Sequence, residues 1–158
     1  MTANRAAGRF VTFEGIEGSG KTTQVTRLAE RLRRLGQRVT TTREPGGTDV
    51  GRQLRAVLLR PAEHPMASRT ELLLYAADRA QHLHEVVLPA LERGEIVLCD
   101  RYLDATLAYQ GHGRGIAAEE ILELHRRTIL DLKKRVEALE PAASPPEPDT
   151  AEGPTYGT

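Results

Sequence analysis

The sequence is poor in cysteine and in aromatic residues, and it has no net charge. Its 158 residues include one cysteine, no tryptophan, four tyrosines and two phenylalanines. The single cysteine, Cys99, excludes an intrachain disulfide framework and fits a reducing compartment, so we expect a cytoplasmic protein. The 22 Lys and Arg residues balance the 22 Asp and Glu residues, so the formal net charge is zero. Without a global electrostatic field, neither a nucleic acid nor a membrane is expected as a partner.

Long hydrophobic runs are also missing. No apolar segment approaches the roughly 20 residues that span a bilayer, and residues 1–9 lack the apolar stretch of a secretory signal. The length corresponds to one domain with room for a hydrophobic core. Because the net charge is zero, any binding of phosphate groups must come from a local site rather than from the overall charge.

Residues 141–158 differ in composition from the rest of the chain. They contain five of the nine prolines, and Tyr156 is their only large apolar side chain. Such a segment cannot bury enough apolar surface to offset the entropy lost on ordering, so we expect a disordered tail. The fold is then expected to lie within residues 1–140.

Short apolar or β-branched runs alternate with helical patterns over the rest of the chain. Pro89 is expected to kink or interrupt the longest helical stretch near its end, and the glycine-rich residues 111–115 to form a mobile loop. Strands separated by helices predict βαβ units, and hence an α/β fold with a parallel sheet flanked by helices. The expected strands are residues 9–14, 37–42 and 95–100, and the expected helices are residues 22–35, 50–59, 68–91 and 117–140.

One segment matches a motif with a known physical role. Residues 15–22 read Gly-Ile-Glu-Gly-Ser-Gly-Lys-Thr and fit G-x-x-x-x-G-K-[ST] between an expected strand and an expected helix. The glycines allow the backbone to wrap around a phosphate, and the following helix adds the positive end of its dipole. Lys21 supplies a mobile cation for the β- and γ-phosphates, and Thr22 a hydroxyl ligand for Mg²⁺. The predicted phosphate-binding residues are Gly15, Ile16, Glu17, Gly18, Ser19, Gly20, Lys21 and Thr22.

Further polar residues follow the other expected strands. Asp100 and Arg101 end the third strand, and residues 43–48, Arg-Glu-Pro-Gly-Gly-Thr, follow the second. Ligands of parallel sheets bind beyond the carboxyl ends of the strands, so we expect both segments beside the phosphate loop. Asp100 is then placed to hold Mg²⁺ and Arg101 to clamp a phosphate. Without the phosphate loop, a surface salt bridge would be the simpler interpretation of this pair.

Tyr75 and Arg79 are four residues apart in an expected helix, so they share one of its faces. A planar ring beside a guanidinium suits a nucleobase, which can stack on the ring and accept hydrogen bonds from the arginine. The alternative is a core-facing tyrosine beside an exposed arginine, and the spacing alone favours that alternative.

Four segments together resemble the bacterial thymidylate kinases. They are Phe-Glu-Gly-Ile-Glu-Gly-Ser-Gly-Lys-Thr-Thr at residues 13–23, the segment at 43–48, Asp-Arg-Tyr at 100–102 and Ala-Tyr-Gln-Gly at 108–111. They occur in the family's order and spacing, and the likeness covers about residues 8–127. The resemblance implies a three-layer P-loop kinase domain that transfers the γ-phosphoryl group of ATP to thymidine 5′-monophosphate (dTMP), with Mg²⁺ as cofactor. It also implies a role in dTTP biosynthesis and assembly as a homodimer.

The resemblance further implies roles for individual residues. Lys21, Arg101 and Glu17 would be catalytic, and Thr22 and Asp100 would hold Mg²⁺. Residues 15–22 would bind ATP. The residues that would bind the substrate are Arg43, Pro45, Tyr75, Arg79, Arg101, Thr106, Tyr109 and Gln110.

The resemblance does not extend beyond Arg127. The family's further strands, its arginine-bearing lid and its adenine-binding segment have no visible counterpart, so we expect a fold that is incomplete on its C-terminal side, with one edge of the first strand unpaired. In residues 128–140, aliphatic side chains three and four residues apart predict that the last helix continues, with a second subunit covering it. A remnant strand at residues 128–132 is the structural alternative. A truncated, non-catalytic nucleotide-binding fragment is the functional alternative.

Overall fold

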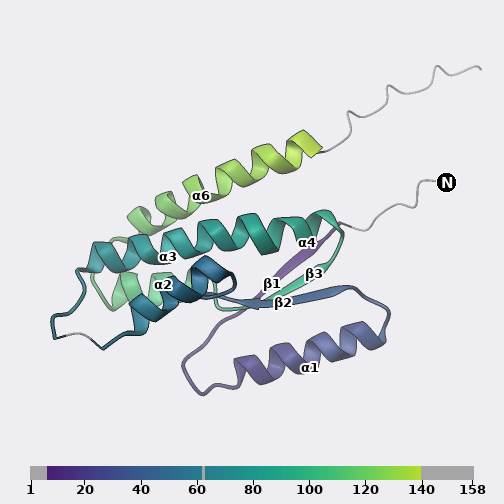
Figure 1. The fold of residues 1–158 in the computed structure, drawn as a ribbon, viewed down its shortest axis with the longest axis horizontal. Coiled ribbons are helices and arrows are strands. Elements are labelled where there is room, and N and C mark those ends of the chain that lie inside the picture. The colour runs from purple at the N-terminus through teal and green to yellow at the C-terminus, as the bar shows by residue number, and fades with distance from the viewer. Residues whose placement is uncertain (1–6, 62, 140–158) are drawn as a thin grey trace, which may run out of the picture.

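The computed structural model describes residues 7–61 and 63–139, which form a three-stranded sheet between layers of helices (Figure 1). Each expected strand and helix is present, and its bounds lie within a few residues of those expected. In chain order the elements are β1 (Arg9–Phe13), α1 (Lys21–Arg34), β2 (Val39–Arg43), α2 (Asp49–Leu59), α3 (Ser68–His82), α4 (Leu88–Glu92), β3 (Ile96–Asp100), α5 (Leu103–Thr106) and α6 (Ala118–Leu139). Two π-helical turns, Leu83–Val87 and Leu107–His112, join α3 to α4 and follow α5.

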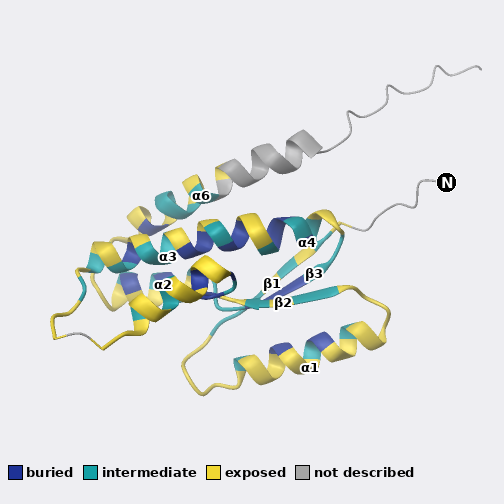
Figure 2. Cartoon of the chain, viewed as in Figure 1, coloured by how far each residue is buried: buried dark blue, intermediate teal, exposed yellow. Residues whose placement is uncertain are grey.

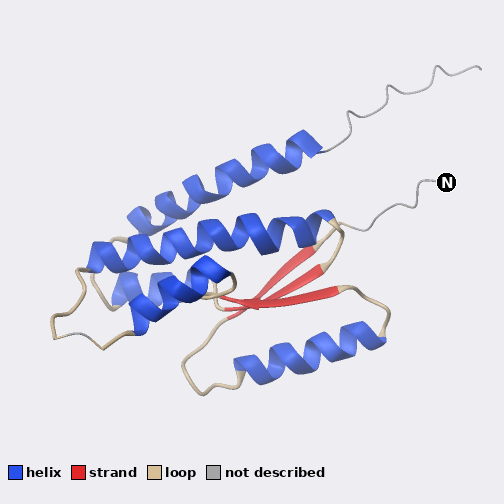
Figure 3. Cartoon of the chain, in the orientation of Figure 1, coloured by secondary structure: helices blue, strands red, loops and turns tan. Residues whose placement is uncertain are grey.

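The three strands run parallel in the order β1-β3-β2 (Figure 3). Their register places Phe13 opposite Asp100, and Asp100 opposite Arg43. The strands therefore end at one level, and the loops that follow them meet at the same edge of the sheet. This arrangement confirms the predicted α/β fold with a parallel sheet flanked by helices.

Helices cover both faces of the sheet. Helix α1 packs against β2 and β3 on one face, and α4 packs against β3 on the other, where α2 and α6 lie against α3 (Figure 1). On β3, Val97 packs with Val87 on the α4 side, and Leu98 packs with Val25 on the α1 side. Both β3 side chains are fully buried (Figure 2). A central strand buried on both faces explains why residues 96–99 form an uninterrupted apolar run.

The structure shows how the chain passes Pro89 and the glycine-rich segment. The α-helical pattern is interrupted just before Pro89 by a π-helical turn, in which Leu88 N–H donates to Leu83 O. This wider turn accommodates a residue that has no N–H to donate. Gly111 belongs to the second π-helical turn rather than to a mobile loop.

The last helix settles the alternative for residues 128–132. Helix α6 runs without interruption from Ala118 to Leu139, so the remnant-strand alternative is wrong. The predicted tail at 141–158 lies outside the described residues, as do the side chains of residues 129 and 131–139, which include the predicted aliphatic stripe.

Strand β1 lies at the edge of the sheet. Within residues 7–61 and 63–139 it pairs with β3 alone, so its other edge has no strand partner, as expected. None of the helices in these two ranges is long and apolar enough to cross a membrane.

Candidate functional site

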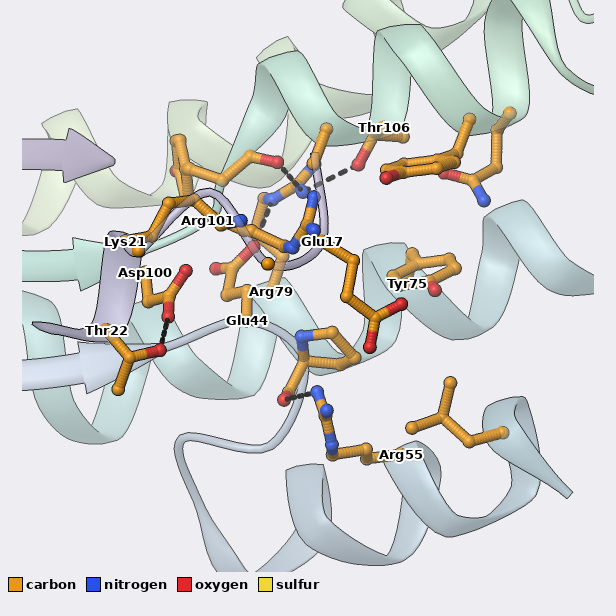
Figure 4. A pocket seen from close by; sticks show the side chains of 18 of the residues that line it. Glu17, Lys21, Thr22, Glu44, Arg55, Tyr75, Arg79, Asp100, Arg101 and Thr106 are labelled. Atoms are coloured by element: carbon orange, nitrogen blue, oxygen red, sulfur yellow. Dashed lines mark hydrogen bonds and ion pairs between the residues drawn. The ribbon is translucent and has the colours of Figure 1, made fainter. Parts of the chain in front are cut away.

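A cavity of about 630 Å³ opens at the carboxyl edge of the sheet. The phosphate loop, the ends of β2 and β3, and helices α2, α3 and α5 form its walls (Figure 4). Most of the predicted site residues line this one cavity: Glu17, Gly18, Gly20, Lys21, Thr22, Pro45, Tyr75, Arg79, Asp100, Arg101, Thr106, Tyr109 and Gln110. Segments that are far apart in the sequence are therefore brought together as the parallel topology predicts.

The phosphate loop is shaped by glycine conformations that other residues rarely adopt. Gly18 and Gly20 have φ values of 76° and 83°, and Gly20 directly precedes the first residue of α1. Lys21 Nζ donates to Ile16 O at 2.7 Å, so the lysine folds back across its own loop. The loop thus combines an ammonium group with the N-terminal end of a helix, which is a suitable environment for phosphate oxygens.

Thr22 and Asp100 form a pair of oxygen ligands between α1 and β3. Thr22 Oγ1 donates to Asp100 Oδ2 at 2.7 Å. No group of three or more His, Cys, Asp and Glu residues suited to a metal occurs among the described residues. A pair of hard oxygens fits Mg²⁺, which takes few ligands from a protein and completes its shell with phosphates and water. The residues present therefore fit the predicted cofactor.

Arg101 has a left-handed backbone conformation, with φ at 73°. Hydrogen bonds fix the backbone on both sides of this residue. Arg101 N–H donates to Phe13 O at 3.0 Å, Cys99 Sγ donates to Arg101 O at 3.1 Å, and Tyr102 N–H donates to Glu14 Oε1 at 2.7 Å. Such strain persists only where surrounding contacts impose it, and it is concentrated at functional sites. The predicted phosphate-clamping arginine is thus held by the strand that leads into the phosphate loop.

Glu14 holds the backbone next to Arg101 in place, a role that sequence reasoning missed. Its second carboxylate oxygen, Oε2, is buried and has no hydrogen-bond partner among the residues described. Burial raises the pKa of this carboxyl, and the hydrogen bond from Tyr102 N–H opposes the shift. The sequence feature that could have indicated this role is the position of Glu14 between β1 and the phosphate loop.

Arg79 is almost completely buried, with 4% of its surface exposed. Its Nε donates to Glu44 Oε2 at 2.9 Å, and its Nη2 donates to Tyr102 O at 3.1 Å and to Thr106 Oγ1 at 2.8 Å. The guanidinium also lies over the Tyr102 ring, 4.8 Å from its centre. The alternative of an exposed arginine is therefore wrong.

Two further residues hold Glu44 in place. His82 is fully buried on α3; its Nδ1 lies 2.8 Å from Glu44 Oε1, and its Nε2 lies 2.7 Å from Thr42 Oγ1. A continuous chain of polar contacts thus runs from β2 through α3 to α5. We call Thr42, His82, Glu44, Arg79 and Thr106 the buried network. Sequence reasoning missed Glu44 and His82 because their pairing depends on how α3 packs beside the end of β2.

Asp78 packs against the loop that follows β2. Its Oδ1 accepts a hydrogen bond from Gly46 N–H at 3.0 Å, while Oδ2 is buried without a partner in the described part of the chain. Burial, and then the charge of Glu44, raise the pKa of this carboxyl. Tyr75 lines the cavity on the same helix, and burial raises the pKa of its phenol.

Two arginines lie differently from the sequence-based expectation. Arg43 is exposed and lines a second hollow, of about 380 Å³, between α1 and β2, so the structure does not bring it into the main cavity. Arg55 does line the main cavity, and its Nη1 donates to Pro45 O at 3.0 Å. Nothing in the sequence distinguishes Arg55 from the other arginines, because its role follows from the position of α2.

Comparison with known proteins fits this arrangement. Residues 13–136 match the family model of thymidylate kinase. The chain belongs to the thymidylate kinase family. It is 62% identical over 118 residues to a thymidylate kinase of Geobacter sp. (strain M21), covering 75% of this chain and 52% of that protein. With a thymidylate kinase of Pelobacter propionicus it shares 56% identity over 126 residues, 80% of this chain and 58% of that one.

A solved structure supports the same assignment. The crystal structure of thymidylate kinase from Ehrlichia chaffeensis superposes with a TM-score of 0.72 at 42% identity, covering 78% of this chain and 66% of that one. The family match ends at residue 136 rather than near 127, so part of α6 belongs to it. The chain spans about half the length of the first of its curated relatives, the Geobacter protein.

Proposed function

We propose that residues 1–140 act as a P-loop kinase domain that transfers the γ-phosphoryl group of ATP to dTMP. The observation that supports this most directly is the single cavity that joins the phosphate loop to Tyr75 and Arg79. In Figure 4, Lys21, Thr22 and Asp100 lie at one end of the view and Tyr75 at the other. A donor phosphate and an acceptor nucleotide bound at these two ends would meet near Arg101.

At the donor end, the chain supplies positive charge and oxygen ligands. The loop amides of residues 15–20 and the Lys21 ammonium would bind the β- and γ-phosphates of ATP. Thr22 and Asp100 would hold Mg²⁺, which neutralises phosphate charge when bound. Arg101 is placed to bind the acceptor phosphate, because its backbone is fixed beside the phosphate loop. Glu17, which extends from that loop into the cavity, would contact the sugar (Figure 4).

At the acceptor end, the chain offers a ring, a hydrogen-bond donor and an acceptor. Tyr75 presents a ring on which a base can stack. Among the described residues, the hydrogen bonds of Arg79 engage Nε and Nη2, which leaves Nη1 as a donor for a base oxygen. Gln110, 2% exposed, supplies an amide from the turn after α5. We place the pyrimidine of dTMP between these three side chains, with Pro45, Thr106 and Tyr109 completing the wall.

A coupled assay of ADP formation with ATP, Mg²⁺ and dTMP tests this proposal, and Lys21→Ala provides the matched control. We expect dTMP-dependent turnover that falls at least a hundredfold in Lys21→Ala, because that variant removes the cation at the donor phosphates. Turnover in the wild-type chain no higher than in Lys21→Ala would overturn the proposal. Thermal stabilisation by ATP or dTMP without turnover would identify instead a nucleotide-binding chain that does not catalyse transfer.

We further propose that the chain forms a homodimer in the cytoplasm. Leu73 on α3 and Leu122 on α6 are 58% and 45% exposed, so adjacent helices present apolar side chains to the surroundings. The buried Cys99 thiol is compatible with a reducing compartment. Sedimentation velocity should give the mass of two chains, and Leu122→Glu should shift it to one; a monomeric wild-type chain would contradict the dimer.

A further inference from the structure

Gln110 has a hydrogen bond that fixes which way its amide faces. Its Nε2 donates to Glu71 Oε1 at 2.7 Å, from the turn after α5 to the first turn of α3. A carboxylate can only accept hydrogen bonds, so the NH₂ group of Gln110 must face Glu71. The amide oxygen of Gln110 then faces away from Glu71 and can accept a hydrogen bond from a ligand in the cavity that Gln110 lines.

Glu71 is itself held in place from the other side. Arg114 Nη2 lies 3.2 Å from Glu71 Oε2, and the Glu71 side chain is 15% exposed. This ion pair restricts the rotation of the Glu71 carboxylate. Glu71, Gln110 and Arg114 thus form a second polar cluster, distinct from the buried network around Arg79.

We infer that Glu71 is a positioning residue that sets the base preference of the acceptor site. Through Glu71, Gln110 presents an acceptor, while the hydrogen bonds of Arg79 leave its Nη1 as the donor for the base. A thymine or uracil ring offers the complementary pair, a donor at N3–H and an acceptor at O4. Cytosine offers an acceptor at N3 and a donor at its 4-amino group, so both contacts are mismatched. This inference rests on the proposed acceptor site for dTMP.

The test is the affinity of the full chain for dTMP, dUMP and dCMP, measured by isothermal titration calorimetry. In Glu71→Gln, the new amide can turn its own NH₂ towards Gln110, which frees Gln110 to rotate. We expect the affinities for dTMP and dUMP to fall together by about tenfold, the scale of one mispaired buried group, while that for dCMP does not fall. Glu71→Met, which removes both acceptor oxygens, should give the same pattern if Glu71→Gln folds poorly.

Two matched variants separate positioning from general damage. Glu71→Asp keeps an acceptor-only carboxylate and should retain most of the preference for dTMP over dCMP. Glu120→Gln removes an exposed carboxylate that pairs with Arg69, and should change none of the three affinities. Equal losses of affinity for all three nucleotides in Glu71→Gln, or an unchanged ratio of the dTMP and dCMP affinities, would overturn this inference but not the proposed function. A wild-type chain that does not bind dTMP would overturn the proposed function as well.

Discussion

Single residues in this chain take their properties from contacts that lie far away in the sequence. Arg79 is four residues from Tyr75, and that spacing favours an exposed arginine. Instead, Glu44, Thr106 and the Tyr102 carbonyl accept hydrogen bonds from its guanidinium, and such partners make its burial energetically acceptable. Sequence reasoning found Arg79 through the family resemblance but could not find Glu44 or His82. Their pairing depends on the relative position of β2 and α3, which no local pattern encodes.

Thr42→Val tests whether the buried network controls Arg79. The substitution keeps the shape of the side chain but leaves His82 Nε2 without its partner, on the side of the ring opposite Glu44. We expect about fivefold weaker dTMP binding and a loss of about 1 kcal/mol in unfolding free energy, with ATP affinity unchanged. Calorimetry and urea denaturation measure these quantities.

Thr40→Val is the matched control for this experiment. Thr40 lies two residues away on the same strand, and its hydroxyl donates to Glu95, outside the buried network. Thr42→Ser restores a hydroxyl and should recover most of the dTMP affinity. If Thr42→Val and Thr40→Val bind dTMP equally well, the buried network does not position Arg79.

At the scale of elements, the regular patterns were predictable and the irregular ones were not. The three strands and the longer helices were expected because the period of the apolar residues changes where the chain changes structure, whereas the short helix α5 was not. The two π-helical turns were not predicted, because they depend on local constraints such as the N–H group that Pro89 lacks. The second of these turns includes Tyr109 and Gln110, so part of the wall of the proposed acceptor site depends on an element that periodicity does not reveal.

The orientation of whole elements likewise decides which arginines reach the cavity. Arg55 enters from α2 and contacts Pro45, whereas Arg43 ends β2 and lies beside α1. The order of motifs in the sequence fixes the sheet edge at which each segment emerges, because parallel strands end together. It does not fix the side of the sheet to which each side chain turns.

At the scale of the whole molecule, α6 links the family fold to the sequence that follows it. Ile121 on α6 is 2% exposed, and the ring of His125 meets Tyr102 edge-on with centroids 5.3 Å apart. Tyr102 in turn lies under Arg79. The helix therefore supports the wall of the proposed acceptor site from behind, although none of its described side chains lines the main cavity.

Truncation at two points tests where the domain ends. A chain of residues 1–140 should keep the unfolding free energy and dTMP affinity of the full chain within experimental error, because the composition of 141–158 offers little to bury. A chain of residues 1–117 should lose about 3 kcal/mol or more, since it uncovers the surface that Ile121 buries against α3 and removes the His125 contact. Urea denaturation and calorimetry on the three chains give both quantities. A loss of more than about 1 kcal/mol in the 1–140 chain would place residues 141–158 within the folded domain, because that loss exceeds what removal of an unpacked segment produces.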